Sequence, residues 1–228
     1  MSQARELGSG PLGRATASVY TLLITGLLLV LVTAPSAVLV LLLDASPGNL
    51  PAMAAVLVPV GPAISAAVFA LHDADRAEEL SPARAFWRGY RLGVVDALKL
   101  WVPYLLAVTV IGFTLVNIEL AGVPAGYGLL LLVLGVALTV WVLQALLISA
   151  LFSFRARDVA RLSVYYLARL PLVGLGALAI VIIALGIVVL TLEPILVLAA
   201  PVLLWMLVRT SAPLIRDVTT NFTTEGTP

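Results

Sequence analysis

Arginine and aromatic side chains alternate in one short stretch of the sequence, FWRGYR at residues 86–91, where they could bind an anionic or apolar partner. Read as a helix, the stretch carries aromatic side chains on one face and arginines on another: Phe86, Trp87 and Tyr90 against Arg84, Arg88 and Arg91. A helix of this kind lies in the membrane interface, with tryptophan and tyrosine at the headgroups and arginines on anionic lipid phosphates. The pattern therefore predicts an interfacial helix that contacts anionic lipid or a partner protein.

Nucleic acid is the alternative partner, because it also attracts arginine and stacks on aromatic rings. That interpretation needs an exposed basic surface, whereas four carboxylates come immediately before the stretch: Asp73, Asp75, Glu78 and Glu79. We therefore expect no nucleic-acid partner. Ser81 and Pro82 mark the start of the predicted helix, as its N-cap and its first helical residue.

A second stretch of the same kind lies at residues 157–166, where Asp158 can serve as the N-cap. Two arginines, Arg157 and Arg161, lie beside an apolar face formed by Val159, Leu162 and Tyr166. The adjacent pair Tyr165-Tyr166 resembles the pair Phe86-Trp87 of the first stretch. The sequence thus predicts two interfacial amphipathic helices on the cytoplasmic side.

Three residues inside a long apolar segment would disturb a helix: Pro59, Gly61 and Pro62. Broken helices line substrate sites in transporters, where the freed backbone groups bind ions. Prolines in membrane helices more often produce a kink that neighbouring helices tolerate, and we favour this interpretation. Small side chains in the same segment, such as Ser65 and Ala66, would let another helix approach closely.

Two polar features lie in or next to other apolar segments. Asp96 and Lys99 are three residues apart, so they can pair on one helix face near the membrane surface. Gln144 lies deep in its segment, and we expect it to bond a neighbouring helix.

The residue types give little support for enzymatic or cofactor chemistry. There is no cysteine and one histidine, so thiol catalysis is excluded and a metal site would need carboxylates, which are scattered along the chain. We find no nucleophile–base pair, no metal-binding spacing and no phosphate-binding loop. We therefore expect a protein that is not an enzyme and that binds no cofactor or metal.

The composition requires lipid around the elements that carry these residues. The 228 residues are 62% hydrophobic and 11% charged, with a mean hydropathy of +1.14, and one soluble core cannot bury so much apolar surface. A spanning helix needs about 20 apolar residues, and six segments qualify: Val19–Leu43, Pro51–Leu71, Leu98–Ile118, Tyr127–Phe154, Leu172–Leu192 and Ile195–Ile215. We predict one all-α polytopic membrane bundle over residues 1–228, with short cytoplasmic tails at 1–17 and 217–228. Five spans, with the last segment half inserted, is the alternative count.

The basic residues lie on one side of this predicted bundle. All thirteen Lys and Arg fall in the N-terminal tail, in the second and fourth connections with the helices that follow them, and at the C-terminal end. The charged residues of the first, third and fifth connections are all carboxylates: Asp44, Glu119 and Glu193. Because positive residues stay in the cytoplasm during insertion, we predict a multi-pass plasma-membrane protein with both termini cytoplasmic.

The segment Gly61-Pro62-Ala63 with Ala67, the polar loop after it and the stretch ARAFWRGYR resemble the YesL-like family of bacterial membrane proteins, a domain of unknown function. The later stretch ISALFSFRARDVARLSVYYLARLPLVGL is similar to that family's second cytoplasmic segment, and the resemblance covers about Ala17 to Arg216. It implies a polytopic plasma-membrane protein, of a family often encoded beside sugar ABC importers and glycan-degrading enzymes. It implies no activity and no catalytic or binding residues.

These features together favour a non-enzymatic accessory component, linked to carbohydrate uptake through subunits of a sugar ABC importer. The alternative is a small-solute transporter or channel in its own right. The predicted spans offer it mainly hydroxyl groups, which can instead bond their own helix backbone: Thr25, Thr33, Thr109 and Thr114.

Overall fold

The computed structural model describes residues 11–44, 46–73, 81–118, 124–190 and 193–222, and within these ranges the chain forms helices and connections without any strand. In chain order the helices are α1 (Pro11–Leu42), the 3-10 turn η2 (Pro47–Asn49), α2 (Leu50–Val56), α3 (Val60–Asp73), α4 (Pro82–Val116), α5 (Ala125–Leu151), α6 (Ala156–Arg169), α7 (Pro171–Leu190), α8 (Glu193–Thr210) and α9 (Ala212–Phe222). The prediction of an all-α chain is confirmed for these residues. The predicted tails lie partly outside the described residues, and their described parts belong to α1 and α9. Asp75, Glu78 and Glu79 also lie outside the described residues.

The outer surface of this bundle is apolar. Along α1, Leu23, Leu27 and Leu31 recur every fourth residue and are each more than 60% exposed, whereas Thr21 and Thr25 on the other side are buried. A helix of a water-soluble protein does the reverse and turns its apolar face inward. Large exposed apolar side chains also cover α4, α5 and α7. Such a surface fits a lipid environment rather than water.

Three helices are long and apolar enough to cross a membrane singly: α1 from Thr16, α4, and α5 from Gly126. Three bent pairs meet the same criterion when each pair counts as one span, which raises the number to six. The pairs are η2 and α2 with α3, α6 with α7, and α8 with α9, and they bend by 42°, 102° and 49°. By length and composition the structure therefore has three to six candidate spans.

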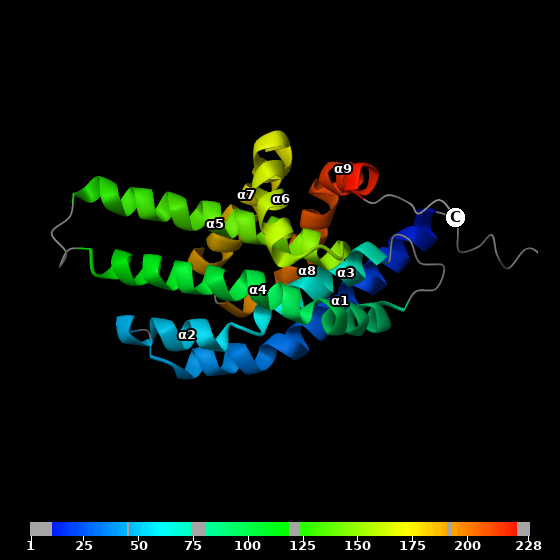
Figure 1. The fold of residues 1–228 in the computed structure, drawn as a ribbon. Coiled ribbons are helices and arrows are strands. Elements are labelled where there is room, and N and C mark those ends of the chain that lie inside the picture. Colours follow the sequence, from blue (N-terminus) through cyan, green and yellow to red (C-terminus); the bar gives the residue numbers. More distant parts are fainter. Residues whose placement is uncertain (1–10, 45, 74–80, 119–123, 191–192, 223–228) are drawn as a thin grey trace, which may run out of the picture.

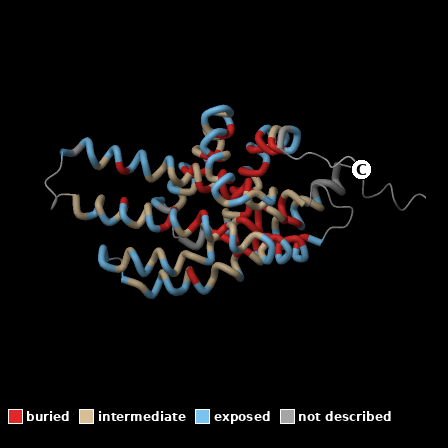
Figure 2. Tube along the Cα trace, viewed as in Figure 1, coloured by how far each residue is buried: buried red, intermediate tan, exposed pale blue. Residues whose placement is uncertain are grey.

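Small residues make α3 the central helix of the bundle. It packs against α1, α4, α5 and α8, and five of its residues are fully buried: Ala63, Ala66, Ala67, Val68 and Ala70. A Cβ atom added to Gly89 of α4 would lie 2.8 Å from the Phe69 side chain, so glycine allows this close crossing. Figure 2 shows the buried residues gathered around α3, whereas the halves of α4 and α5 near their connection are mostly exposed or intermediate.

Helix α4 is unbroken over 35 residues, although the sequence predicted an interfacial helix at its start and a separate span from Leu98. No residue interrupts the helix between the two parts, and Pro103 is accommodated within it. At a rise of 1.5 Å per residue α4 is about 52 Å long, well beyond the roughly 30 Å of the hydrocarbon core. Its first turns therefore continue the axis of the span. Ser81 is the N-cap as predicted, but its side chain makes no capping hydrogen bond.

The second predicted interfacial helix is a separate element, α6. A bend of 102° at Leu170 separates it from α7, so α6 turns away from the direction of that helix (Figure 1). The N-cap is Arg155, and Asp158 lies in the first turn instead of capping it as predicted. At that position its carboxylate still interacts favourably with the positive end of the helix dipole.

Candidate functional site

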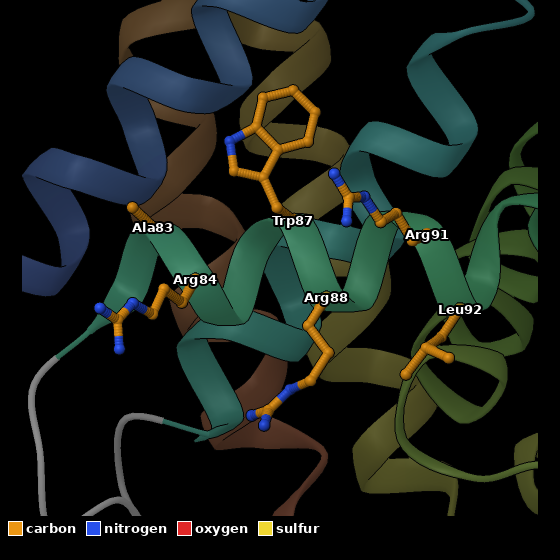
Figure 3. Close-up of a pocket in the computed structure, with 6 residues that line it drawn as sticks. All are labelled: Ala83, Arg84, Trp87, Arg88, Arg91 and Leu92. Atoms are coloured by element: carbon orange, nitrogen blue, oxygen red, sulfur yellow. The ribbon is translucent and has the colours of Figure 1, made fainter.

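A shallow and largely open hollow of about 620 Å³, called the groove below, lies along the first turns of α4 and is lined by residues of this helix. Two adjacent stripes of the helix line it: Ala83, Arg84, Trp87, Arg88, Arg91 and Leu92. In Figure 3, Trp87 and Arg91 project from one side of α4, and Arg84 and Arg88 project from the other. An apolar floor between arginines can hold an apolar side chain of a partner while the guanidinium groups bind carboxylates beside it.

The free charge of this groove comes from Arg84 and Arg91. Arg88 donates a hydrogen bond to Oδ2 of Asp73 at 2.8 Å, and its guanidinium carbon lies 5.4 Å from the centre of the Phe69 ring. Both contacts attach the start of α4 to the end of α3, and the first one neutralises this arginine. Arg84 and Arg91 are exposed and pair with no carboxylate among the described residues. The groove therefore keeps a positive charge.

The three aromatic residues predicted to share one contact face have different environments. Phe86 is fully buried in the core, and Tyr90 is partly buried against it. Trp87 is 41% exposed, and its ring packs edge-on against Phe86 and Tyr90 with centroids 5.8 and 5.9 Å apart. Phe86 is thus a packing residue and not the contact residue that was predicted. It holds Trp87 in a fixed orientation at the surface.

On α6 the structure also separates residues that were predicted to act together. Tyr166 is buried with Val159 and Ser163, and its hydroxyl donates to Oδ2 of Asp217 in α9 at 2.7 Å. Burial and the bond to Asp217 raise the pKa of Tyr166 well above its ordinary value. The prediction of Tyr166 as a contact residue is therefore wrong. An apolar helix face can be covered by lipid or by a neighbouring helix, and here protein covers the face that carries Tyr166. The role of Asp217 was missed, since nothing in its local sequence indicates a partner so distant in the chain.

The exposed face of α6 is a row of side chains spaced four residues apart: Arg157, Arg161, Tyr165 and Arg169. Arg169 donates to the Tyr165 hydroxyl, and its guanidinium carbon lies 5.5 Å from the centre of the Tyr165 ring. The contact with Tyr165 raises the pKa of the Arg169 guanidinium. Arg169 was not among the predicted contact residues, although its spacing from Tyr165 could have indicated it.

The disturbance predicted at Pro59, Gly61 and Pro62 is a break in the helix. Helix α2 ends at Val56 and α3 begins at Val60, with a bend of 42° between them. The indole Nε1 of Trp101, in α4, donates to the Leu57 carbonyl at 2.9 Å, and a Cβ atom at Gly61 would overlap the indole ring. The Leu57 carbonyl at the break therefore accepts from two donors of the protein itself, the Trp101 indole and the Val60 backbone N–H.

Several polar side chains of the helices bond within the bundle. Three threonine hydroxyls donate to carbonyls one turn earlier, as expected of them: Thr33, Thr109 and Thr114. The side chains of Asp96 and Lys99 pair at 2.8 Å, and Gln144 accepts from the Ser211 hydroxyl at 3.5 Å, where α8 meets α9. Five buried polar atoms have no hydrogen-bond partner among the described residues: Thr21 Oγ1, Thr25 Oγ1, Ser65 Oγ, Gln144 Nε2 and Ser149 Oγ.

A smaller cavity, of about 130 Å³, lies where the ends of α3, α5 and α9 meet. It brings His72, Asp73 and Thr219 together from helices distant in sequence, which residue spacing could not have shown. Its Asp73 carboxylate is bound by Arg88, so the cavity adjoins the groove on α4.

Comparisons of the chain with protein-family models, curated proteins and solved structures find no match.

Proposed function

We propose that this chain is a six-span bacterial plasma-membrane protein with both termini in the cytoplasm, and that it acts as a non-enzymatic accessory component. The spans are α1, the α2–α3 pair, the second half of α4, α5, α7 and α8. In this arrangement the first turns of α4 and all of α6 lie on the side that carries the arginines. Because positively charged connections stay inside during insertion, that side is cytoplasmic.

The observation that carries the proposal is the groove at Trp87 on an unbroken helix. The pair Asp96–Lys99 marks the membrane edge of α4, since Leu100–Val116 carries no charge. Trp87 lies nine residues before Asp96, about 14 Å further along the axis. This distance exceeds the headgroup layer of roughly 5–8 Å. The groove then faces the cytosol, where a protein partner can reach it.

The composition of the groove suits a protein partner. Tryptophan and arginine dominate binding energy at protein interfaces, above all where an aromatic anchor fills a pocket. Phe86, whose ring packs edge-on against Trp87, belongs to the same core cluster as the buried residues of α3 and gives this anchor a rigid support. The resemblance to the YesL-like family is what suggests a subunit of a sugar ABC importer as this partner.

A solute transporter is the second candidate. The break between α2 and α3 and the unpartnered hydroxyls of Thr25 and Ser65 favour it, because transporters bind solutes at broken helices. The contacts of the Leu57 carbonyl at this break weigh against it, since the Trp101 indole and the Val60 N–H both donate to an oxygen that an ion could otherwise use. We therefore place the accessory function first.

Affinity capture of membrane partners from mild detergent tests the accessory function. Trp87→Ala should weaken partner binding by about 2 kcal/mol, or roughly thirtyfold, while the protein still inserts and folds. Tyr127→Ala is the matched control, because Tyr127 is also 41% exposed but lies at the start of α5. Solute flux through the purified protein alone in liposomes would contradict the accessory function and support the transporter.

A further inference from the structure

We infer that the row Arg157, Arg161, Tyr165 and Arg169 on α6 is a binding site for the phosphodiester headgroups of anionic lipids. This inference does not depend on the partner proposed for α4, because the row lies on a different helix and binds a different class of ligand. Its function would be to hold α6 at the cytoplasmic membrane surface.

The row has a fixed orientation, because the opposite face of α6 is bonded to α5 and α9. Tyr166 is bonded to Asp217, and the indole Nε1 of Trp141 in α5 donates to the Ala160 carbonyl at 3.2 Å. With its inner face buried, α6 presents the row outward along its whole length. The stacking of Arg169 on Tyr165 orders that guanidinium before a ligand arrives.

Lipid is favoured over an acidic protein by what surrounds the row. It ends at Arg169, and within three residues α7 presents Leu172, which is 81% exposed. Val164, also exposed, adjoins the row on α6 itself. Apolar surface at one end and arginines beside it match the acyl chains and the phosphate of one lipid molecule. Tyrosine is enriched at this boundary, and guanidinium groups bind phosphate through two parallel hydrogen bonds.

The local charge fits an anion. Two described carboxylates lie on α6 or are bonded to it: Asp158, which is exposed in the first turn, and Asp217, whose Oδ2 accepts from Tyr166. The arginines of the row therefore outnumber the carboxylates that could neutralise them. The bend of 102° from α7 directs α6 away from the span, as expected of a helix that follows a membrane surface.

The test uses the whole protein in phosphatidylcholine vesicles that contain a trace of spin-labelled phosphatidylglycerol or of spin-labelled phosphatidylcholine. Electron paramagnetic resonance measures the fraction of each label held at the protein. Wild type should select phosphatidylglycerol, and the triple variant Arg157→Gln, Arg161→Gln, Arg169→Gln should lose that selection by about fivefold or more, because one arginine near an anionic surface contributes on the order of a fivefold change. Lysine at the same three positions should restore only part of it, because the charge is kept but the paired hydrogen bonds and the stacking on Tyr165 are lost.

The matched control removes the same number of charges from α4, through Arg84→Gln, Arg88→Gln and Arg91→Gln, and should keep the selection. Equal loss in both triple variants would overturn the inference, since it would show a general effect of net charge. Unchanged selection in the α6 variant, or none in wild type, would also overturn it. Inorganic phosphate should displace no more label than chloride does at the same ionic strength, and stronger displacement would assign the row to free phosphate instead.

Discussion

Trp101 joins two parts of the chain that are 44 residues apart. Its indole donates to the Leu57 carbonyl, and its ring fills the space beside Gly61. The Leu57 carbonyl also accepts from the Val60 backbone N–H, so the indole adds a second hydrogen bond at the bend between α2 and α3. One such bond typically contributes about 0.5–1.5 kcal/mol. Pro59 and Pro62 predicted a disturbance there, but the sequence could not identify Trp101, because a bond over such a separation leaves no local pattern.

We expect Gly61→Ala to destabilise the protein by about 1–3 kcal/mol, because the added methyl group must displace the indole of Trp101. Gly112→Ala is the matched control, since nothing lies within 4 Å of its Cβ position. That variant should be neutral, or more stable by up to about 1 kcal/mol, as alanine is the better helix former. Thermal unfolding in detergent measures both. Equal melting temperatures would show that the indole is not packed against Gly61.

At the level of helices, α4 and α6 carry similar residues in different settings. Helix α4 continues into a span, whereas α6 ends before Pro171, because the residue before a proline is disfavoured in the α conformation. The sequence predicted an amphipathic pattern for both. It could not predict what covers the apolar faces, since lipid and a packed helix select the same side chains. Phe86 and Tyr166 are both covered by protein.

The hydrogen bond from Tyr166 of α6 to Asp217 of α9 should make the stability of the protein depend on pH. Tyr166→Phe should lower the stability at neutral pH by about 1.5–3 kcal/mol, because a hydrogen bond to a carboxylate is lost. The pKa of Tyr166 is raised in the folded protein above its ordinary value of 10.0, so its contribution is complete below that pH and declines above it. The gap between wild type and variant should therefore narrow at about pH 11.

Chemical denaturation in detergent at about pH 8 and about pH 11 measures this gap. Tyr127→Phe serves as the control, because it makes the same change at a tyrosine that is exposed at the start of α5. A gap for Tyr166→Phe that stays constant over this range would show that the hydroxyl is not held in a buried bond.

Over the whole molecule, the outside is apolar, and several polar side chains lie within. Hydropathy alone located the apolar segments well, because it measures composition over about 20 residues. It could not show that the second, fifth and sixth segments belong to bent pairs, since a bend depends on a few backbone angles. The groove on α4 could be predicted in its residue types but not in its shape, which depends on Phe86 being buried and Trp87 exposed.

The proposed placement of the groove in the cytoplasm is tested most directly by labelling single cysteines with an impermeant maleimide. The chain has no cysteine, so the background is clean. On sealed cells we predict labelling at Ser46→Cys, which lies in the first connection, and none at Ala83→Cys in the groove or at Ala156→Cys at the start of α6. All three should react once the cells are permeabilised. Labelling of Ala83→Cys or Ala156→Cys on sealed cells would contradict the orientation and remove the groove from the reach of any cytoplasmic partner.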